Sequence, residues 1–181
     1  MQHFFAMEKL STYTIAFKGL KEGIHEFDYP IGNSFFELFE GSLVDSGKLV
    51  ASVILEKRSS FMSLQIKISG TVALICDRCL ESYDQEVENE ASLFLKFGET
   101  PFEEGDDVIW LLPEEHQVNV ARLIYEYIIL SVPLRHVHPT LAHGQSGCDP
   151  EMLKKLREHS RHEPETTDDR WDKLKNLLNN N

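Results

Sequence analysis

The stretch that decides the fold is residues 49–75, which read Leu-Val-Ala-Ser-Val-Ile-Leu, Glu-Lys-Arg-Ser-Ser, Phe-Met-Ser-Leu-Gln-Ile-Lys-Ile-Ser, Gly and Thr-Val-Ala-Leu-Ile. In the second apolar run Met62, Leu64, Ile66 and Ile68 occupy every second position, which is typical of one face of a β-strand. The polar turn at residues 56–60 is too short for a helical crossover, so the two runs are predicted to pair antiparallel. Gly70 is expected to interrupt the second strand.

Alternating patterns continue on both sides of this hairpin and then give way to helical spacing. Further strands are predicted over residues 12–18, 23–29 (ended by Pro30), 83–97 and 108–112, and helices over residues 33–40, 120–130 and 151–160. The predicted fold class is α+β: an antiparallel β-sheet or open barrel followed by helices, with a CxxC knuckle. The sheet is expected to pack against the 120–130 helix through a core of Val53, Leu55, Leu64, Ile66, Ile68, Leu74, Leu93, Leu95, Ile124 and Ile128.

Length and composition indicate one soluble domain. With 181 residues, 41% hydrophobic and 27% charged, the chain is long enough to bury a core without disulfides. We expect a single α+β domain over residues 1–160, then a flexible linker and a short C-terminal helix over residues 161–181. The sequence has no long apolar run and no signal-peptide core, so no membrane association and a cytoplasmic location are expected.

The charge is strongly uneven along the chain. Twelve acidic residues and one basic residue lie within residues 81–115, while the rest of the chain is nearly neutral, so the formal net charge is −12. This balance argues against DNA binding, which depends on Lys and Arg neutralising phosphates. The acidic segment suits either a solvated surface or an interface for a basic protein partner.

Cys76-Asp-Arg-Cys79 is the chemically informative motif. A CxxC on a tight turn between strands places two thiolates at the separation that tetrahedral zinc needs. Residues that could complete the site lie about sixty positions further on, between two predicted helices: His136, His138, His143 and Cys148. The alternatives are a redox dithiol, which usually opens a helix after a parallel strand, and two buried thiols without a ligand.

Several motifs in order resemble the YceD family, the large ribosomal RNA subunit accumulation proteins. They are Ile-Cys-Asp-Arg-Cys-Leu at residues 75–80, the helix that Val-Asn-Val leads at residues 118–120, Leu-Ser-Val-Pro-Leu at 130–134, and Asp-Arg-Trp-Asp-Lys-Leu at 169–174. Many relatives carry a second cysteine pair, which this chain has only in part. The resemblance implies that Cys76 and Cys79 match the first pair and that Cys148 matches one cysteine of the second.

The fourth ligand of the expected structural zinc site is then a histidine. We choose His138, because imidazole commonly replaces thiolate at zinc, and we keep His136 and His143 as alternatives.

The resemblance implies a non-enzymatic role in ribosome biogenesis, supporting synthesis, processing or stability of large-subunit (23S) rRNA in a bacterial cytoplasm. The expected partners are rRNA or ribosome-assembly proteins. Two alternatives are an acidic interaction module for a basic ribosomal or RNA-processing protein, and an unrecognised metal-dependent enzyme. No catalytic motif supports the second of these. The bases expected to contact RNA are Lys57, Arg58, Arg78, Arg122, Arg135, Lys154, Lys155 and Arg157.

Overall fold

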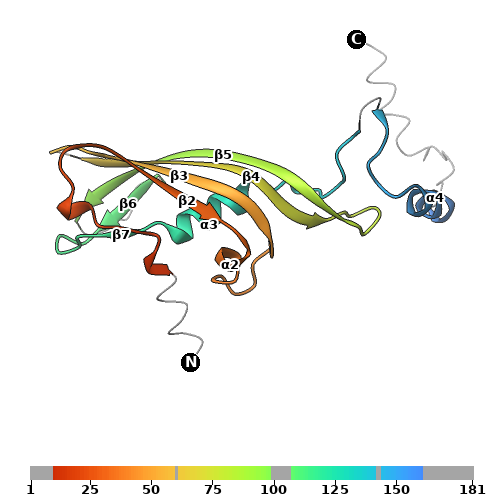
Figure 1. Cartoon of the computed structure of the whole chain (residues 1–181), viewed down its shortest axis with the longest axis horizontal. Coiled ribbons are helices and arrows are strands. Elements are labelled where there is room, and N and C mark those ends of the chain that lie inside the picture. Colours follow the sequence, from red (N-terminus) through yellow and green to blue (C-terminus); the bar gives the residue numbers. More distant parts are fainter. Residues whose placement is uncertain (1–9, 60, 99–106, 142–143, 161–181) are drawn as a thin grey trace, which may run out of the picture.

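The computed structural model of the chain describes residues 10–59, 61–98, 107–141 and 144–160. The predicted linker and C-terminal helix at residues 161–181, the middle of the acidic segment and His143 lie outside these ranges. The described part confirms the α+β class. It is elongated, with a long twisted sheet, helix α3 along one face of it, and helix α4 at one end (Figure 1).

The sheet has five strands in the order β2-β3-β4-β5-β6. Their bounds are Gly23–Ile31, Gly47–Lys57, Met62–Ile75, Ser82–Phe97 and Val108–Leu111. The first four strands form an antiparallel meander, as predicted, because each turn joins neighbours along the chain. Strand β6 pairs parallel to the end of β5, so the sheet is mixed and does not close into a barrel.

Three local predictions were wrong for identifiable reasons. Pro30 does not end β2, because β2 lies at the edge of the sheet, where a missing backbone N–H is tolerated. Gly70 does not interrupt β4; it adopts a φ of 146° inside the continuous strand. The expected strand over residues 12–18 is only β1 (Thr14–Ile15), followed by the 3-10 turn η1 (Phe17–Gly19).

The helices cover one face and one end of the sheet. Helix α2 (Asn33–Phe36) is shorter than predicted, and its N-cap residue is Gly32. Helix α3 (Ala121–Ser131) begins where β7 (Val118–Asn119) ends, and the Asn119 side chain accepts a hydrogen bond from the Ala121 amide. Helix α4 (Pro150–His159) is confirmed with both ends one residue earlier than predicted, and the Asp149 carboxylate accepts a hydrogen bond from the Glu151 amide as its N-cap.

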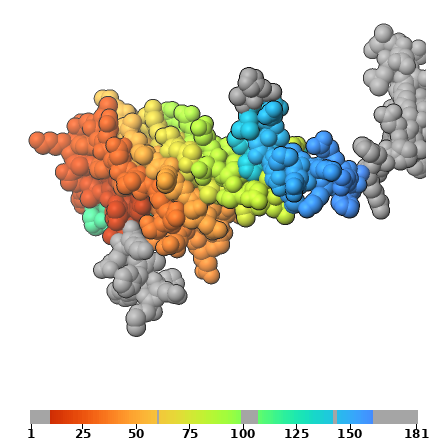
Figure 2. Space-filling model, turned by 45° about the vertical axis from the view of Figure 1, so that its right-hand side comes forward, coloured from red at the N-terminus to blue at the C-terminus, as the bar shows by residue number. Residues whose placement is uncertain are grey.

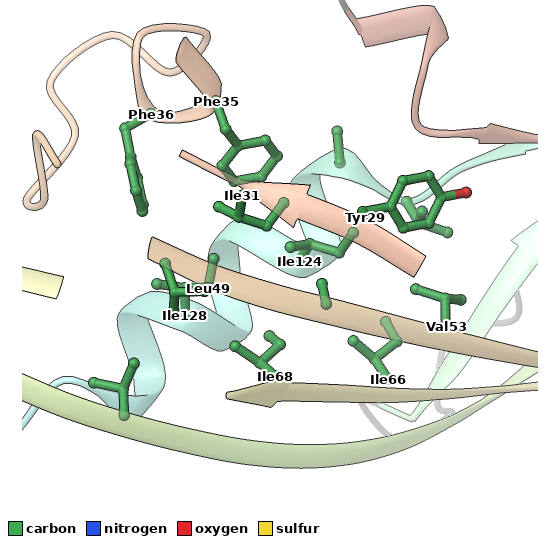
Figure 3. Packing of buried hydrophobic residues seen from close by; sticks show 14 of the residues in the cluster. Tyr29, Ile31, Phe35, Phe36, Leu49, Val53, Ile66, Ile68, Ile124 and Ile128 are labelled. Atoms are coloured by element: carbon green, nitrogen blue, oxygen red, sulfur yellow. The ribbon is translucent and has the colours of Figure 1, made fainter. Parts of the chain in front are cut away.

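The core lies between the sheet and α3. Figure 3 shows Ile124 and Ile128 of α3 on the side of the inward-pointing residues of β3 and β4, with Leu49 and Ile68 next to Ile128. Phe35 and Phe36 of α2 close the side of this core beside β2. All ten predicted core residues are buried, which confirms the period-2 assignment of the inward faces.

The other face of β5 is acidic, as its alternation predicted. Asp84, Glu86, Glu88 and Glu90 alternate with inward residues and are all exposed. Within the described part of the chain, Glu90 is contacted from the neighbouring strand β4: the Gln65 side-chain amide donates to its carboxylate at 2.6 Å, and the Lys67 ammonium lies 3.6 Å from it. Among the described helices, none has the length and apolar character needed to cross a bilayer.

Candidate metal centre

The first half of the centre is the turn that joins β4 to β5. Cys76 directly follows the last residue of β4, and its amide and carbonyl bond to the Glu81 carbonyl and the Leu80 amide, both at 2.9 Å. The Arg78 amide points at the Cys76 sulfur over 3.4 Å. Leu80 takes a left-handed φ of 62°, which is uncommon for a leucine and reverses the chain tightly after Cys79. This is the expected knuckle. It forms because Ile75, the last residue of β4, pairs with Ser82, the first residue of β5, so the six residues between them make a tight turn.

The second half is the chain between α3 and α4, which is fastened to the knuckle by a reciprocal pair of hydrogen bonds. The Asp77 amide donates to the His136 carbonyl at 2.7 Å, and the His136 amide donates to the Asp77 carboxylate at 2.8 Å. Further along, an isolated bridge joins Thr140 to Ser146 and folds the loop back on itself. Cys148, just before α4, thereby returns to the knuckle.

Four side chains meet where the halves join: Cys76, Cys79, His138 and Cys148. Their ligand atoms all lie within 4.8 Å of one another, and the three sulfurs belong to buried residues. The Cys76 and Cys148 sulfurs are 3.7 Å apart, and the Cys79 sulfur is 3.4 Å from Nδ1 of His138. Four ligands at 2.3 Å in a tetrahedron would hold their sulfurs about 3.8 Å apart, so this donor set fits zinc.

The same distances describe the state of the cysteines. The Cys76 and Cys148 sulfurs lie 3.7 Å apart, well beyond the roughly 2.05 Å of a disulfide, and all three cysteines are free thiols. Of the alternative ligands, the His136 backbone bonds to Asp77 and its ring is not part of the four-residue group. The structure therefore brings together the expected set with His138.

The surroundings of Cys76 favour its thiolate form. Burial raises the pKa of the Cys76 thiol, but hydrogen bonds outweigh burial and lower this pKa to about 5. These bonds come from the backbone amides of Cys79, Arg78 and His138 and from the His138 ring. A thiol with this pKa is largely ionised at neutral pH, which is the form that binds metal.

Two residues that support the site had no signal in the sequence. The Tyr83 ring packs against the His138 ring with centroids 4.8 Å apart, and Tyr83 is buried. Burial raises the pKa of the Tyr83 hydroxyl, and the neighbouring Cys76 charge adds to this. Asp77 contributes the hydrogen bonds to His136. Neither contact can be read from spacing, because each depends on where the distant loop folds back.

The bases expected to contact RNA separate into four places. Arg78 and Arg135 line one hollow beside the centre, together with His138. Lys154, Lys155 and Arg157 lie on exposed α4, which follows Cys148; Figure 2 shows α4 beside this end of the sheet. Lys57 and Arg58 line a different hollow at the opposite end, and Arg122 on α3 is ion-paired with Glu126. The eight bases therefore do not form one surface.

The fold and the site define a class: an α+β protein with a mixed sheet and a buried Cys3His cluster between a β-hairpin turn and a helix-flanked loop. The family model described as large ribosomal RNA subunit accumulation protein YceD matches residues 64–178. The match covers well over half of the chain and includes all four clustered residues, so the chain belongs to the YceD family. Comparisons with curated proteins and with solved structures give no match.

Proposed function

We propose that this protein is a non-catalytic factor in the bacterial cytoplasm that supports synthesis, processing or stability of 23S rRNA by binding it. Membership of the YceD family carries this proposal, because the family's name ties it to accumulation of large ribosomal subunit RNA. A binding role is further supported by the cluster, in which protein side chains supply all four ligand positions. A catalytic zinc site would instead keep a position open for water or substrate.

The proposed metal is a structural zinc ion held by Cys76, Cys79, His138 and Cys148. Its role would be to fasten the α3–α4 loop, and α4 with it, to the β4–β5 turn, since these segments are distant in sequence. We also propose that residues 1–160 form one domain, because sheet, helices and cluster share one hydrophobic core.

We expect protein purified without added metal to contain about one zinc ion per chain, because three thiolates and one imidazole form a complete tetrahedral set. Elemental analysis by mass spectrometry measures the ratio directly. His136→Ala is the matched control: it removes an imidazole from the same loop that is not among the four ligands, so it should keep the metal, whereas His138→Ala should lose it. Equal zinc content in the two variants would contradict this ligand assignment.

Loss of the protein is expected to lower large-subunit rRNA relative to small-subunit rRNA, because the proposed role acts on the large-subunit RNA alone. Quantifying both rRNAs in a deletion strain and in a strain complemented with the wild-type gene measures this ratio. Crosslinking followed by sequencing of the bound RNA tests whether the contact is direct. An unchanged ratio would contradict the proposed function; a lowered ratio with no crosslinked rRNA would contradict direct binding only.

The acidic face of β5 supports a second candidate, an interface for a basic ribosomal or RNA-processing protein. Four exposed carboxylates follow one another along one face of a single strand, and they repel phosphates within a Debye length of about 8 Å. RNA would therefore approach elsewhere, while a basic protein would find complementary charge here. Replacing Glu86 and Glu88 by glutamine should release such a partner in a pull-down and leave rRNA crosslinking intact.

A further inference from the structure

A polar hollow of about 460 Å³ lies beside the Cys3His cluster and has the composition of an anion site. Its lining consists of two guanidinium groups, one imidazole, two hydroxyl groups and small or apolar residues, and it contains no carboxylate among the described residues. The lining residues are Arg78, Arg135, Val137, His138, Pro139, Thr140, Gly144 and Ser146. In a chain with a formal charge of −12, this hollow has two arginines and no acidic residue among its described lining residues.

The two arginines come from different parts of the chain and are held together by the backbone. Arg78 follows Asp77, and Arg135 precedes His136, and these two neighbours exchange the reciprocal hydrogen bonds of 2.7 and 2.8 Å. The spacing of the arginine backbones is therefore fixed. Both side chains are exposed, and neither forms an ion pair with a residue in the described ranges. Their charge is available to a ligand.

The larger hollow at the opposite end is a weaker candidate, although it also contains bases and aromatic rings. Its lining includes the carboxylates of Glu22 and Glu115. The Lys57 ammonium is used internally, because it donates to the carbonyls of Phe17 and Leu20 at 2.9 and 2.8 Å. Arg58 is ion-paired with Glu56. The charge there is largely compensated within the protein.

We infer that the Arg78–Arg135 hollow is a binding site for the phosphodiester groups of RNA. Guanidinium groups present a planar fork of donors that matches phosphate oxygens, and two of them can clamp one phosphate or span neighbouring phosphates. Thr140 and Ser146 add hydroxyl groups that can donate to phosphate oxygens. This inference rests on the proposed function, since that function supplies RNA as the polyanion.

The cluster makes this site conditional on the metal. Arg78 lies between Cys76 and Cys79, while Arg135 lies three residues before His138, so each half of the cluster carries one arginine. A metal ion that joins the halves therefore also holds the arginines on one hollow. Without it, the two segments would be held by weaker contacts, namely the Asp77–His136 hydrogen bonds, the contacts among the cluster side chains and the packing of Tyr83 on the His138 ring. RNA affinity should consequently depend on the metal even though the metal does not touch RNA.

The test compares full-length wild type with Arg78→Gln/Arg135→Gln in binding to a fluorescent single-stranded fragment of large-subunit rRNA at several salt concentrations. Each lost phosphate contact lowers the slope of log affinity against log salt by about 0.7, so the double variant should lose about 1.4 in slope and roughly 25-fold in affinity at 0.1 M salt. Lys18→Gln/Lys21→Gln is the charge-matched control, because both lysines are exposed and lie before β2, at the other end of the sheet. It should retain nearly the wild-type slope.

The possible outcomes distinguish a failure of this inference from a failure of the proposed function. Wild-type RNA binding with an unchanged slope in the arginine variant would overturn the inference and leave the proposed function standing. No RNA binding by the wild type would overturn direct RNA contact itself. NMR of the guanidinium groups follows the binding of inorganic phosphate in the arginine hollow. If phosphate saturates the hollow and RNA still binds with unchanged affinity, the assignment of the hollow to RNA is wrong. Chelation should weaken RNA binding by the wild type, and re-added zinc should restore it.

Discussion

Replacing Cys148 by serine is expected to detach α4 from the molecule while leaving the sheet folded. Helix α4 has no buried residue of its own, and only Met152 and Leu153 pack partly against the core. A helix of 10 residues is marginal in water by itself, so it depends on its attachment. Structural zinc contributes binding free energy of roughly 10 kcal/mol to small folds, which is far more than those two side chains supply. Its loss should therefore release the whole loop.

Hydrogen exchange read by mass spectrometry measures this result. In Cys148→Ser, the amides of residues 136–159 should exchange at nearly unfolded rates, while those of β3, β4 and β5 stay protected. His136→Ala serves as the control, because it keeps all four ligands and the backbone hydrogen bonds to Asp77. If α4 stayed as protected in Cys148→Ser as in the control, the cluster would not be what holds this end together.

Gly70→Ala is expected to destabilise the sheet more than any other exchange of glycine for alanine in the described strands. A Cβ atom at Gly70 would lie 2.3 Å from the Lys48 carbonyl oxygen and 2.6 Å from the Leu49 Cα, and the φ of 146° is one that alanine rarely adopts. The obstructing atoms belong to the backbone of the neighbouring strand, so they cannot rotate away. We expect a loss of about 3 kcal/mol or more, equivalent to a fall in Tm of roughly 6–12 °C.

Two other glycines separate the causes of this loss, and thermal unfolding followed by circular dichroism measures all three variants. Gly41 has a positive φ of 73° but open space around its Cβ position, so Gly41→Ala should show only the conformational cost of about 1 kcal/mol. Gly32 has neither feature, so Gly32→Ala should leave Tm nearly unchanged. A Gly70→Ala protein as stable as Gly41→Ala would show that β3 and β4 adjust to the added atom.

The sheet was predictable wherever one face is buried and the other meets water. The alternation of Leu64, Ile66 and Ile68 reports that asymmetry directly, and it identified the inward face of β4. Pro30 and Gly70 were misjudged because their effect depends on position in the sheet: a proline is tolerated at an edge, and a glycine can serve a close approach between strands. The parallel pairing of β6 had no local signal, since four consecutive apolar residues at 108–111 suit a strand of either direction.

The sequence predicted the four residues that cluster in the structure, but it did not predict their surroundings. The CxxC spacing identified Cys76 and Cys79 as candidate ligands, and the resemblance to the family pointed to Cys148. His138 was selected by its chemistry, and the structure places it in the cluster while His136 bonds through its backbone. The hollow that Arg78 shares with Arg135 could not be foreseen, because it exists only once the α3–α4 loop has folded back onto the turn.

The pairing of β1 with β7 has a consequence for the order in which the chain can fold. Strands β2 to β5 each pair with their neighbour along the chain, so this meander can form early from local contacts. Thr14, in contrast, pairs with Asn119, and the Tyr13 carbonyl accepts the Val120 amide at the start of α3. Contacts between residues so distant in sequence form late, because bringing them together costs the conformational entropy of the long intervening loop. On the ribosome, Ile15 and Phe17 would emerge well before β7 and α3 and would remain unburied until those elements had been made.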